Sequence, residues 1–184
     1  FFIKNGHTVL YKKDKDSDLI EFSRTILNAC MSYILFQRNN LVIHSSGVEF
    51  DDHTVLFVGT SGSGKSSMAY DLGKRANKKT ISEDFMCIYE NKNDKMIARP
   101  SYPILKLDSD IAVNNDLNRI SKSMIDPLKR TFYINKNFTN KSNKIIKKIF
   151  FLKWSNEYKI ERIDYKDAFE NLFLNTVRYF PPYE

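Results

Sequence analysis

One stretch of consecutive residues constrains this chain more than any other feature. Gly59-Thr60-Ser61-Gly62-Ser63-Gly64-Lys65-Ser66 fits the P-loop spacing G-x-x-x-x-G-K-[ST] at every fixed position. Its glycines let consecutive backbone N–H groups turn inward and form a concave anion site. The apolar run 55–58 before it predicts a buried strand, and 67–74 after it predicts a helix whose N-terminus faces the anion. The sequence therefore predicts an α/β fold that binds a nucleotide.

The spacing also predicts the role of each side chain in this loop. Lys65 is expected to reach the β- and γ-phosphates, and the Ser66 hydroxyl is expected to bind Mg²⁺. The nucleotide and Mg²⁺ are thus the expected cofactors. The residues expected to contact the nucleotide are Gly59, Thr60, Ser61, Gly62, Ser63, Gly64, Lys65, Ser66 and Ser67.

The composition narrows the class of protein. With 184 residues, 42% of them hydrophobic, the chain is long enough for one domain with a core. It begins with Phe1, so we interpret it as a fragment and leave open a missing N-terminal region. No apolar run has the length of a membrane span, and no signal-peptide pattern leads the chain. Cys30 and Cys87 lie outside metal or redox spacings, which favours two core residues in a reducing, cytoplasmic compartment.

The net charge of +7 comes largely from lysines between residues 122 and 166. It favours a solvated lysine-rich surface over a nucleic-acid, membrane or acidic-partner site. No RNA-binding motif, zinc-finger spacing or zipper heptad is present, so we expect no nucleic-acid partner and no membrane partner. We expect one domain, 1–184, with four parts: a hairpin and helix at 1–40, a nucleotide-binding core at 41–107, a candidate substrate loop at 108–145, and C-terminal strands and a helix at 146–184.

Local patterns predict the elements of these parts. Asn5-Gly6 predicts a hairpin turn. Residues 18–38 have helical spacing, with Asp18 and Glu21 resembling a capping box. The expected strands are 41–44, 47–50, 55–58, 79–81, 86–89, 96–98, 145–154 and 158–163, the last two as a hairpin. The remaining expectations are weak helix at 108–121, a mobile polar segment at 122–145 with an apolar island at 131–134, and an amphipathic helix at 165–179 before Pro181-Pro182.

Three polar residues extend the site beyond the loop. A P-loop needs a further acidic group for Mg²⁺ or its water, ordinarily at the end of a later strand. Glu83 and Asp84 are the nearest candidates, and an adjacent pair can divide metal binding from proton transfer. His44 ends a strand that we expect to neighbour the P-loop strand. Spacing alone leaves His44 open between a structural and a catalytic role.

These residues together resemble a known family. His44-Ser45-Ser46-Gly47-Val48-Glu49, then the P-loop, then Ile81-Ser82-Glu83-Asp84 resembles the catalytic domain of HPr kinase/phosphorylase and its homologues. The resemblance covers roughly residues 41–107 and extends more loosely to the C-terminus. It implies the fold of that family, which is similar to phosphoenolpyruvate carboxykinase: α/β, with the P-loop on a mixed sheet with flanking helices.

The resemblance also implies roles. Glu83 stands where the family has the first Asp of a pair, taken as the base for a serine hydroxyl, and Asp84 stands at the second, on the metal side. His44 matches a histidine that lines the active site. The chain departs from the pattern in having Glu as the base, Ser67 where HPr kinases have Glu, and no Arg-Gly-Leu-Gly signature. It looks more like the HPr-kinase-like proteins that phosphorylate a serine of a lasso-peptide precursor.

The leading hypothesis is therefore an ATP- and Mg²⁺-dependent serine kinase whose partner is a peptide or small protein, and which forms a homo-oligomer. Catalysis would depend on Glu83, Asp84, His44 and Lys65, with the metal on Ser66 and Asp84. Alternatives are a small-molecule hydroxyl kinase and an ATP-binding regulatory module without transfer. Further candidates for phosphate or acidic-substrate contacts are Lys106, Arg99 and Arg130.

Overall fold

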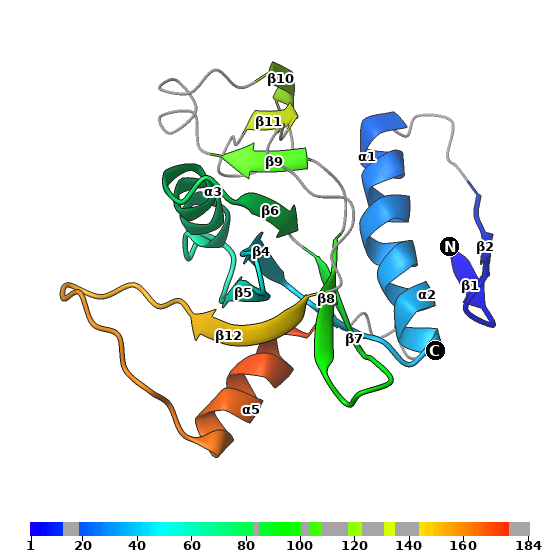
Figure 1. Ribbon diagram of the computed structural model, residues 1–184. Helices are drawn as coiled ribbons and strands as arrows, with labels where there is room; N and C mark the ends of the chain where they lie inside the picture. Colours follow the sequence, from blue (N-terminus) through cyan, green and yellow to red (C-terminus); the bar gives the residue numbers. More distant parts are fainter. Residues whose placement is uncertain are drawn as a thin grey trace.

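The computed structural model describes residues 1–12, 19–82, 85–100, 104–107, 118–122, 131–134 and 144–176 (Figure 1). Its elements in chain order are β1 (Phe2–Lys4), β2 (Thr8–Leu10), α1 (Leu19–Thr25), η1 (Ile26–Cys30), α2 (Met31–Gln37), β3 (Leu41–Ile43), β4 (Ser45–Glu49), β5 (His53–Val58), α3 (Lys65–Arg75), β6 (Lys79–Ser82), β7 (Met86–Glu90), β8 (Met96–Arg99), β9 (Ile104–Leu107), β10 (Asn118–Lys122), β11 (Thr131–Ile134), β12 (Ile145–Phe151) and α5 (Tyr165–Asn175).

A seven-stranded sheet forms the centre of the described fold, in the order β3-β7-β8-β12-β5-β4-β6. β5 pairs in parallel with β12 and antiparallel with β4, so the sheet is mixed around the strand that precedes the glycine-rich stretch. This confirms the predicted α/β class and the predicted mixed sheet. Two smaller sheets accompany it, β1-β2 and β10-β11-β9.

The two faces of β5 pack against different helices. Side chains of a strand alternate between faces, and successive residues of β5 do so here. Phe57 belongs to a cluster that includes Ala69 of α3. Leu56 belongs to the other cluster, against which Leu172 of α5 packs. Figure 1 shows α3 and α5 on opposite sides of the central strands. Burial on both faces explains why the run 55–58 is continuously apolar.

Gly47 owes its identity to this core. A β-carbon added there would lie 2.8 Å from Leu56 Cδ2, 3.0 Å from Ile81 Cγ1 and 3.1 Å from Met86 Cε. Real side chains do not approach so closely in a packed interior. The glycine three residues after His44 therefore lets β4 lie against the side chains of its neighbours.

The N-terminal hairpin and helix form as predicted. Asn5 and Gly6 both have positive φ, as the tight turn requires. The Gly6 N–H donates to Gln37 Oε1 at 2.7 Å, and Arg38 Nε donates to the Gly6 carbonyl at 2.7 Å. The helical segment is continuous but contains the π-helical stretch η1, which the spacing did not reveal. The expected capping box at Asp18 and Glu21 lies outside the described side chains.

Both cysteines are buried and free, as predicted. Cys30 ends η1, and Cys87 lies in β7. Burial raises the pKa of both thiols, which favours the neutral, unreactive form.

One strand prediction that bears on the site is wrong in its pairing. β3, which leads to His44, pairs with β7 at the edge of the sheet and not with β5. The neighbour of β5 is β4, which begins immediately after His44. Hydrophobic pattern identifies strands but contains little information about which strands pair, because pairing is decided by contacts distant in sequence.

Predictions for the second half of the chain are partly wrong. Residues 118–121 belong to strand β10 and not to a helix, and the apolar island 131–134 is strand β11, paired with β10 and β9. β12 has β5 and β8 as partners, and residues 158–163 form no hairpin strand with it. The C-terminal helix α5 ends at Asn175, capped at its start by the Asp164 side chain, which accepts from the Asp167 N–H.

Candidate functional site

The residues between β5 and α3, 59–64, form a loop that we call the glycine loop. Gly62 and Gly64 have φ of 84° and 90°, in the left-handed region that only glycine adopts readily. A β-carbon added at either would meet nothing within 4 Å, so the space next to these two positions is open. Conformation, and not crowding, therefore requires glycine at these two positions.

Gly59 is required on both grounds, because its φ of 157° is one that side chains rarely adopt and the space beside it is crowded. A β-carbon added there would lie 2.7 Å from Ser63 Oγ and 2.8 Å from the Leu152 carbonyl oxygen. Leu152 follows β12 and continues its pairing with β5, because its N–H donates to the Val58 carbonyl at 2.8 Å. The first residue of the glycine loop is thus in close contact with Leu152, in the segment that follows β12.

Lys65 is the first residue of α3 and is only 5% exposed. Its Nζ donates to the carbonyls of Gly59 and Thr60, each at 2.9 Å. A buried ammonium is stable only when such partners replace water. The lysine therefore lies inside the curve of the glycine loop, where a positive charge attracts an anion approaching the N-terminus of α3.

The remaining loop residues line the same turn. Ser66 and Ser67 are half-buried in the first turn of α3, while Thr60 and Ser61 are exposed. Ser63 Oγ is buried without a hydrogen-bond partner among the residues that the structure describes. The hydroxyls of Ser45, Ser46 and Thr54 share this property among the described residues, so it does not by itself mark a ligand site.

His44 lies at the same end of the β4–β5 strand pair as the glycine loop. Ser45 pairs with Val58 across β4 and β5, so the residues next to this pair, His44 and Gly59, both lie at this end of the strands. The His44 backbone N–H donates to the Asn175 carbonyl of α5 at 2.8 Å. Its ring lies 6.2 Å, centroid to centroid, from the ring of Phe85.

Glu83 and Asp84 lie outside the described residues, so their predicted roles are not tested. The residues on either side of them are described. Ser82 is the last residue of β6 and pairs with Gly47 of β4. Phe85 follows the pair and contacts His44. Both flanking residues therefore neighbour the segment 44–47, which lies beside the end of β5.

Arg99, Lys106 and Arg130 were predicted to contact phosphate or an acidic substrate. None of the described contacts joins them to the glycine loop. The Arg99 guanidinium lies 4.6 Å from the centroid of the Tyr89 ring, across the β7–β8 pair. Such a cation–π contact accounts for an exposed arginine on a strand. The Lys106 side chain and Arg130 lie outside what the structure describes.

The sequence did not predict a cavity at this end of β5. A cavity of about 270 Å³ lies beside the glycine loop. Its wall includes Trp154, whose Nε1–H donates to the Gly62 carbonyl at 3.1 Å. The lining residues are Gly59, Thr60, Ser63, Phe151, Leu152, Lys153, Trp154, Asn171, Leu174 and Asn175. The available signal was the chain's one tryptophan at the end of a strong strand pattern, but its contact with residue 62 spans too many residues to be read from spacing.

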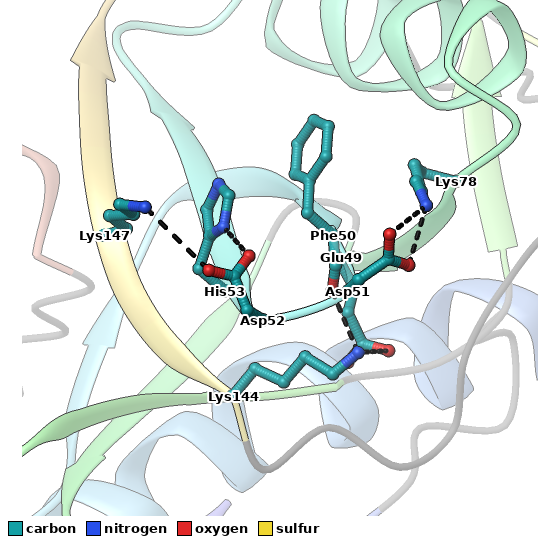
Figure 2. A network of polar contacts seen from close by, with 8 residues as sticks. All are labelled: Glu49, Phe50, Asp51, Asp52, His53, Lys78, Lys144 and Lys147. Atoms are coloured by element: carbon teal, nitrogen blue, oxygen red, sulfur yellow. Dashed lines mark hydrogen bonds and ion pairs between the residues drawn. The ribbon is translucent and has the colours of Figure 1, made fainter.

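The other end of β5 carries a different kind of polar network, shown in Figure 2. Lys78 Nζ bonds both carboxylate oxygens of Asp51, at 2.7 and 2.8 Å. This contact lowers the pKa of Asp51, and the hydrogen bond from His53 lowers the pKa of Asp52. Lys144 Nζ donates to the Phe50 carbonyl at 2.9 Å. These charges are paired with one another, which is the arrangement of a structural network.

The described residues contain no group of three His, Cys, Asp or Glu side chains that could hold a metal ion by themselves. Mg²⁺ bound with a nucleotide needs few protein ligands, because phosphate oxygens and water complete its coordination. Ser66, at the start of α3, fits that requirement. No described helix has the length and apolar character of a membrane span.

No protein-family model matches this chain, and no curated protein matches it. Among solved structures, it is similar to the Hpr(Ser) kinase/phosphatase from Coxiella burnetii, with 18% identity and a TM-score of 0.33. The match covers 37% of this chain and 46% of that one, so the chain spans under half the length of the protein it matches. This likeness is too partial to establish the family of the chain.

Proposed function

We propose that this chain is an ATP-dependent phosphotransferase that phosphorylates a serine hydroxyl of a peptide or small protein. The observation that carries the proposal is the position of three separate segments. The glycine loop, His44 and the residues that flank Glu83-Asp84 all lie beside the end of β5. In α/β sheets, ligands bind at the ends of the strands, where the loops of several strands meet.

The phosphate side of the site is the best supported. Lys65 lies inside the glycine loop and donates to two backbone carbonyls. A phosphate oxygen bound in the loop can replace these carbonyls as the acceptor. The open space at Gly62 and Gly64 gives an anion access to the backbone N–H groups. Ser66 would hold Mg²⁺, which neutralises charge on the phosphates when bound.

The proposal for the acceptor side of the site rests on the residue types of Glu83, Asp84 and His44 and on their positions in the sequence. In the proposed reaction, the serine oxygen forms a bond to the γ-phosphorus while the bond to the bridging oxygen breaks. The serine proton passes to Glu83, and ADP leaves. Asp84 would complete the metal side with Ser66. His44 would line the acceptor site, held in place through its backbone bond to Asn175.

The acceptor class follows from the same proposal. We place the chain with peptide-tailoring kinases acting on a precursor peptide, such as a lasso-peptide precursor, and we propose that it acts as a homo-oligomer in the cytoplasm. Segment 108–145, which includes β10 and β11, is the proposed acceptor-binding segment.

The direct test is Glu83→Gln, which keeps the size of the side chain but removes its basicity. Transfer of labelled γ-phosphate to a serine peptide should be abolished, while ATP binding, measured by calorimetry, should be retained. Glu90→Gln, an exposed residue at the end of β7, is the matched control and should keep full transfer. Normal turnover in Glu83→Gln would refute Glu83 as the base.

The alternatives predict different products. A regulatory module would hydrolyse ATP slowly, with no phosphorylated acceptor in any peptide mixture. A small-molecule kinase would label a low-molecular-weight hydroxyl compound and no peptide. Mass spectrometry of the acceptor after reaction with ATP distinguishes the three.

A further inference from the structure

Trp154 is an exposed aromatic residue whose ring is hydrogen-bonded to the glycine loop. The side chain is 83% exposed, yet its Nε1–H is bonded to the Gly62 carbonyl in the middle of the glycine loop. Tryptophan is large and apolar, and its exposure to water is unfavourable unless a partner covers it. A ring anchored by its polar edge has little conformational freedom left to lose when it binds a ligand.

The ring reaches the glycine loop because two parallel strands end together. β5 and β12 run in parallel and, after a register shift between Ile146 and Lys148, remain paired to their last residues, Val58 and Phe151. The segment after β12 therefore leaves the sheet beside the glycine loop. Trp154 lies three residues beyond Phe151, and the cavity lies between this segment, the loop and α5.

We propose that the nucleobase of the bound nucleotide stacks on Trp154 at the mouth of this cavity. The inference rests on the proposed function, since it assumes that the glycine loop holds the phosphates. Stacking on an aromatic side chain is a common way to bind a base, because every base has a flat π-face. A ring bonded to the glycine loop lies within reach of a base whose phosphates are on that loop.

The chemistry of the cavity favours a base over the peptide acceptor. Its volume of about 270 Å³ is slightly below the usual range for pockets that bind drug-sized ligands, roughly 300–1,000 Å³. A single heterocycle therefore suits the cavity better than a peptide segment does. Its lining residues include the apolar Leu152 and Leu174 and the amide-bearing Asn171 and Asn175. This combination of flat apolar surface and a few amides suits a heterocycle with ring nitrogens.

The protein contains a built-in probe for this inference. Trp154 is the chain's one tryptophan, so tryptophan emission reports on this ring alone. Titration of the purified protein with Mg·ATP should quench or shift the emission. Magnesium tripolyphosphate, which has the phosphates without a base, should bind to the glycine loop and leave the emission largely unchanged.

Variants separate stacking from support of the loop. Trp154→Ala should weaken Mg·ATP binding about ten-fold or more, with tripolyphosphate affinity unchanged by calorimetry. Trp154→Phe keeps a ring but loses the bond to Gly62, and should retain most of the ATP affinity. Tyr158→Ala removes a fully exposed aromatic residue of the same segment that does not line the cavity, and should change neither affinity.

The possible outcomes separate failure of the stacking proposal from failure of the phosphotransferase proposal on which it rests. Equal ATP affinity in Trp154→Ala and wild type would overturn the stacking proposal and leave the phosphotransferase proposal standing. Equal weakening of ATP and tripolyphosphate in both Trp154 variants would also overturn it, because the ring would then only support the loop. Failure of the wild type to bind either ligand would overturn the proposed function and the stacking proposal with it.

Discussion

The two ends of β5 carry polar groups in opposite arrangements. At the His53 end, Lys78 is bonded to Asp51 and the His53 ring is hydrogen-bonded to Asp52, so both carboxylates have partners within the chain. At the Val58 end, two backbone carbonyls of the glycine loop are among the partners of the buried Lys65, and open space and a cavity lie beside this loop. Charges that are paired within the chain hold two segments together. Groups whose partners can be exchanged for those of a ligand are suited to binding.

This contrast predicts that removing the lysine at the Val58 end lowers activity, whereas removing the lysine at the His53 end lowers only stability.

Lys65→Ala should have the largest effect. In the proposed reaction Lys65 faces the transferring phosphoryl group, and its loss should lower the transfer rate by roughly 100-fold or more, the usual effect of removing one electrostatic stabiliser. Steady-state transfer of labelled phosphate to a serine peptide measures it. Lys78→Ala at the other end should keep the wild-type rate. Equal loss of rate in both variants would break the division between the two ends.

Gly59→Ala should lower the free energy of unfolding by about 1–3 kcal/mol, the usual cost of overpacking. The new methyl group would be pressed against the carbonyl oxygen of Leu152, whose backbone is held to β5 by the hydrogen bond from its N–H to the Val58 carbonyl. Gly62→Ala is the matched control, because its methyl group meets open space and costs only the strained φ, about 1–2 kcal/mol. Urea denaturation measures both. A smaller loss for Gly59→Ala than for Gly62→Ala would contradict the close contact with Leu152.

Lys78→Ala should cause a small loss of stability. It removes the partner of Asp51, but that carboxylate is exposed, and exposed ion pairs contribute little because water and salt screen them. The midpoint of urea denaturation should fall slightly, and the difference from wild type should shrink at high salt. A salt-independent difference would show that the lysine acts by packing instead.

The pH dependence should be the smallest effect. The pKa values of Asp51 and Asp52 are lowered in the folded state by Lys78 and His53. Their contribution to stability is therefore fully present above the ordinary pKa of about 4 and is lost as the pH falls through the lowered values. Acid titration of the denaturation midpoint should show this loss, and Lys78→Ala should make it shallower. An unchanged slope in the variant would mean that Lys78 does not set the pKa of Asp51.

Much of the fold near the glycine loop was predictable because it is local. An apolar run followed by glycines and a helical pattern predicts β5, the loop and α3, and the Asn5-Gly6 pair predicts the β1–β2 turn. Glycines that need positive φ, such as Gly64, are recognisable from spacing alone. The partner of β3 and the strand β10 were not predictable, since pairing depends on contacts between distant segments.

The candidate site divides in the same way. The types and order of its residues, Lys65 within a glycine loop and His44 before it, are properties of the sequence, because bonded neighbours fix loop and helix geometry. Only the tertiary structure decided that β12 lies in parallel beside β5 and that Trp154 therefore reaches Gly62. That contact joins residues 92 positions apart, and its existence depends on the packing of the whole sheet rather than on any local preference.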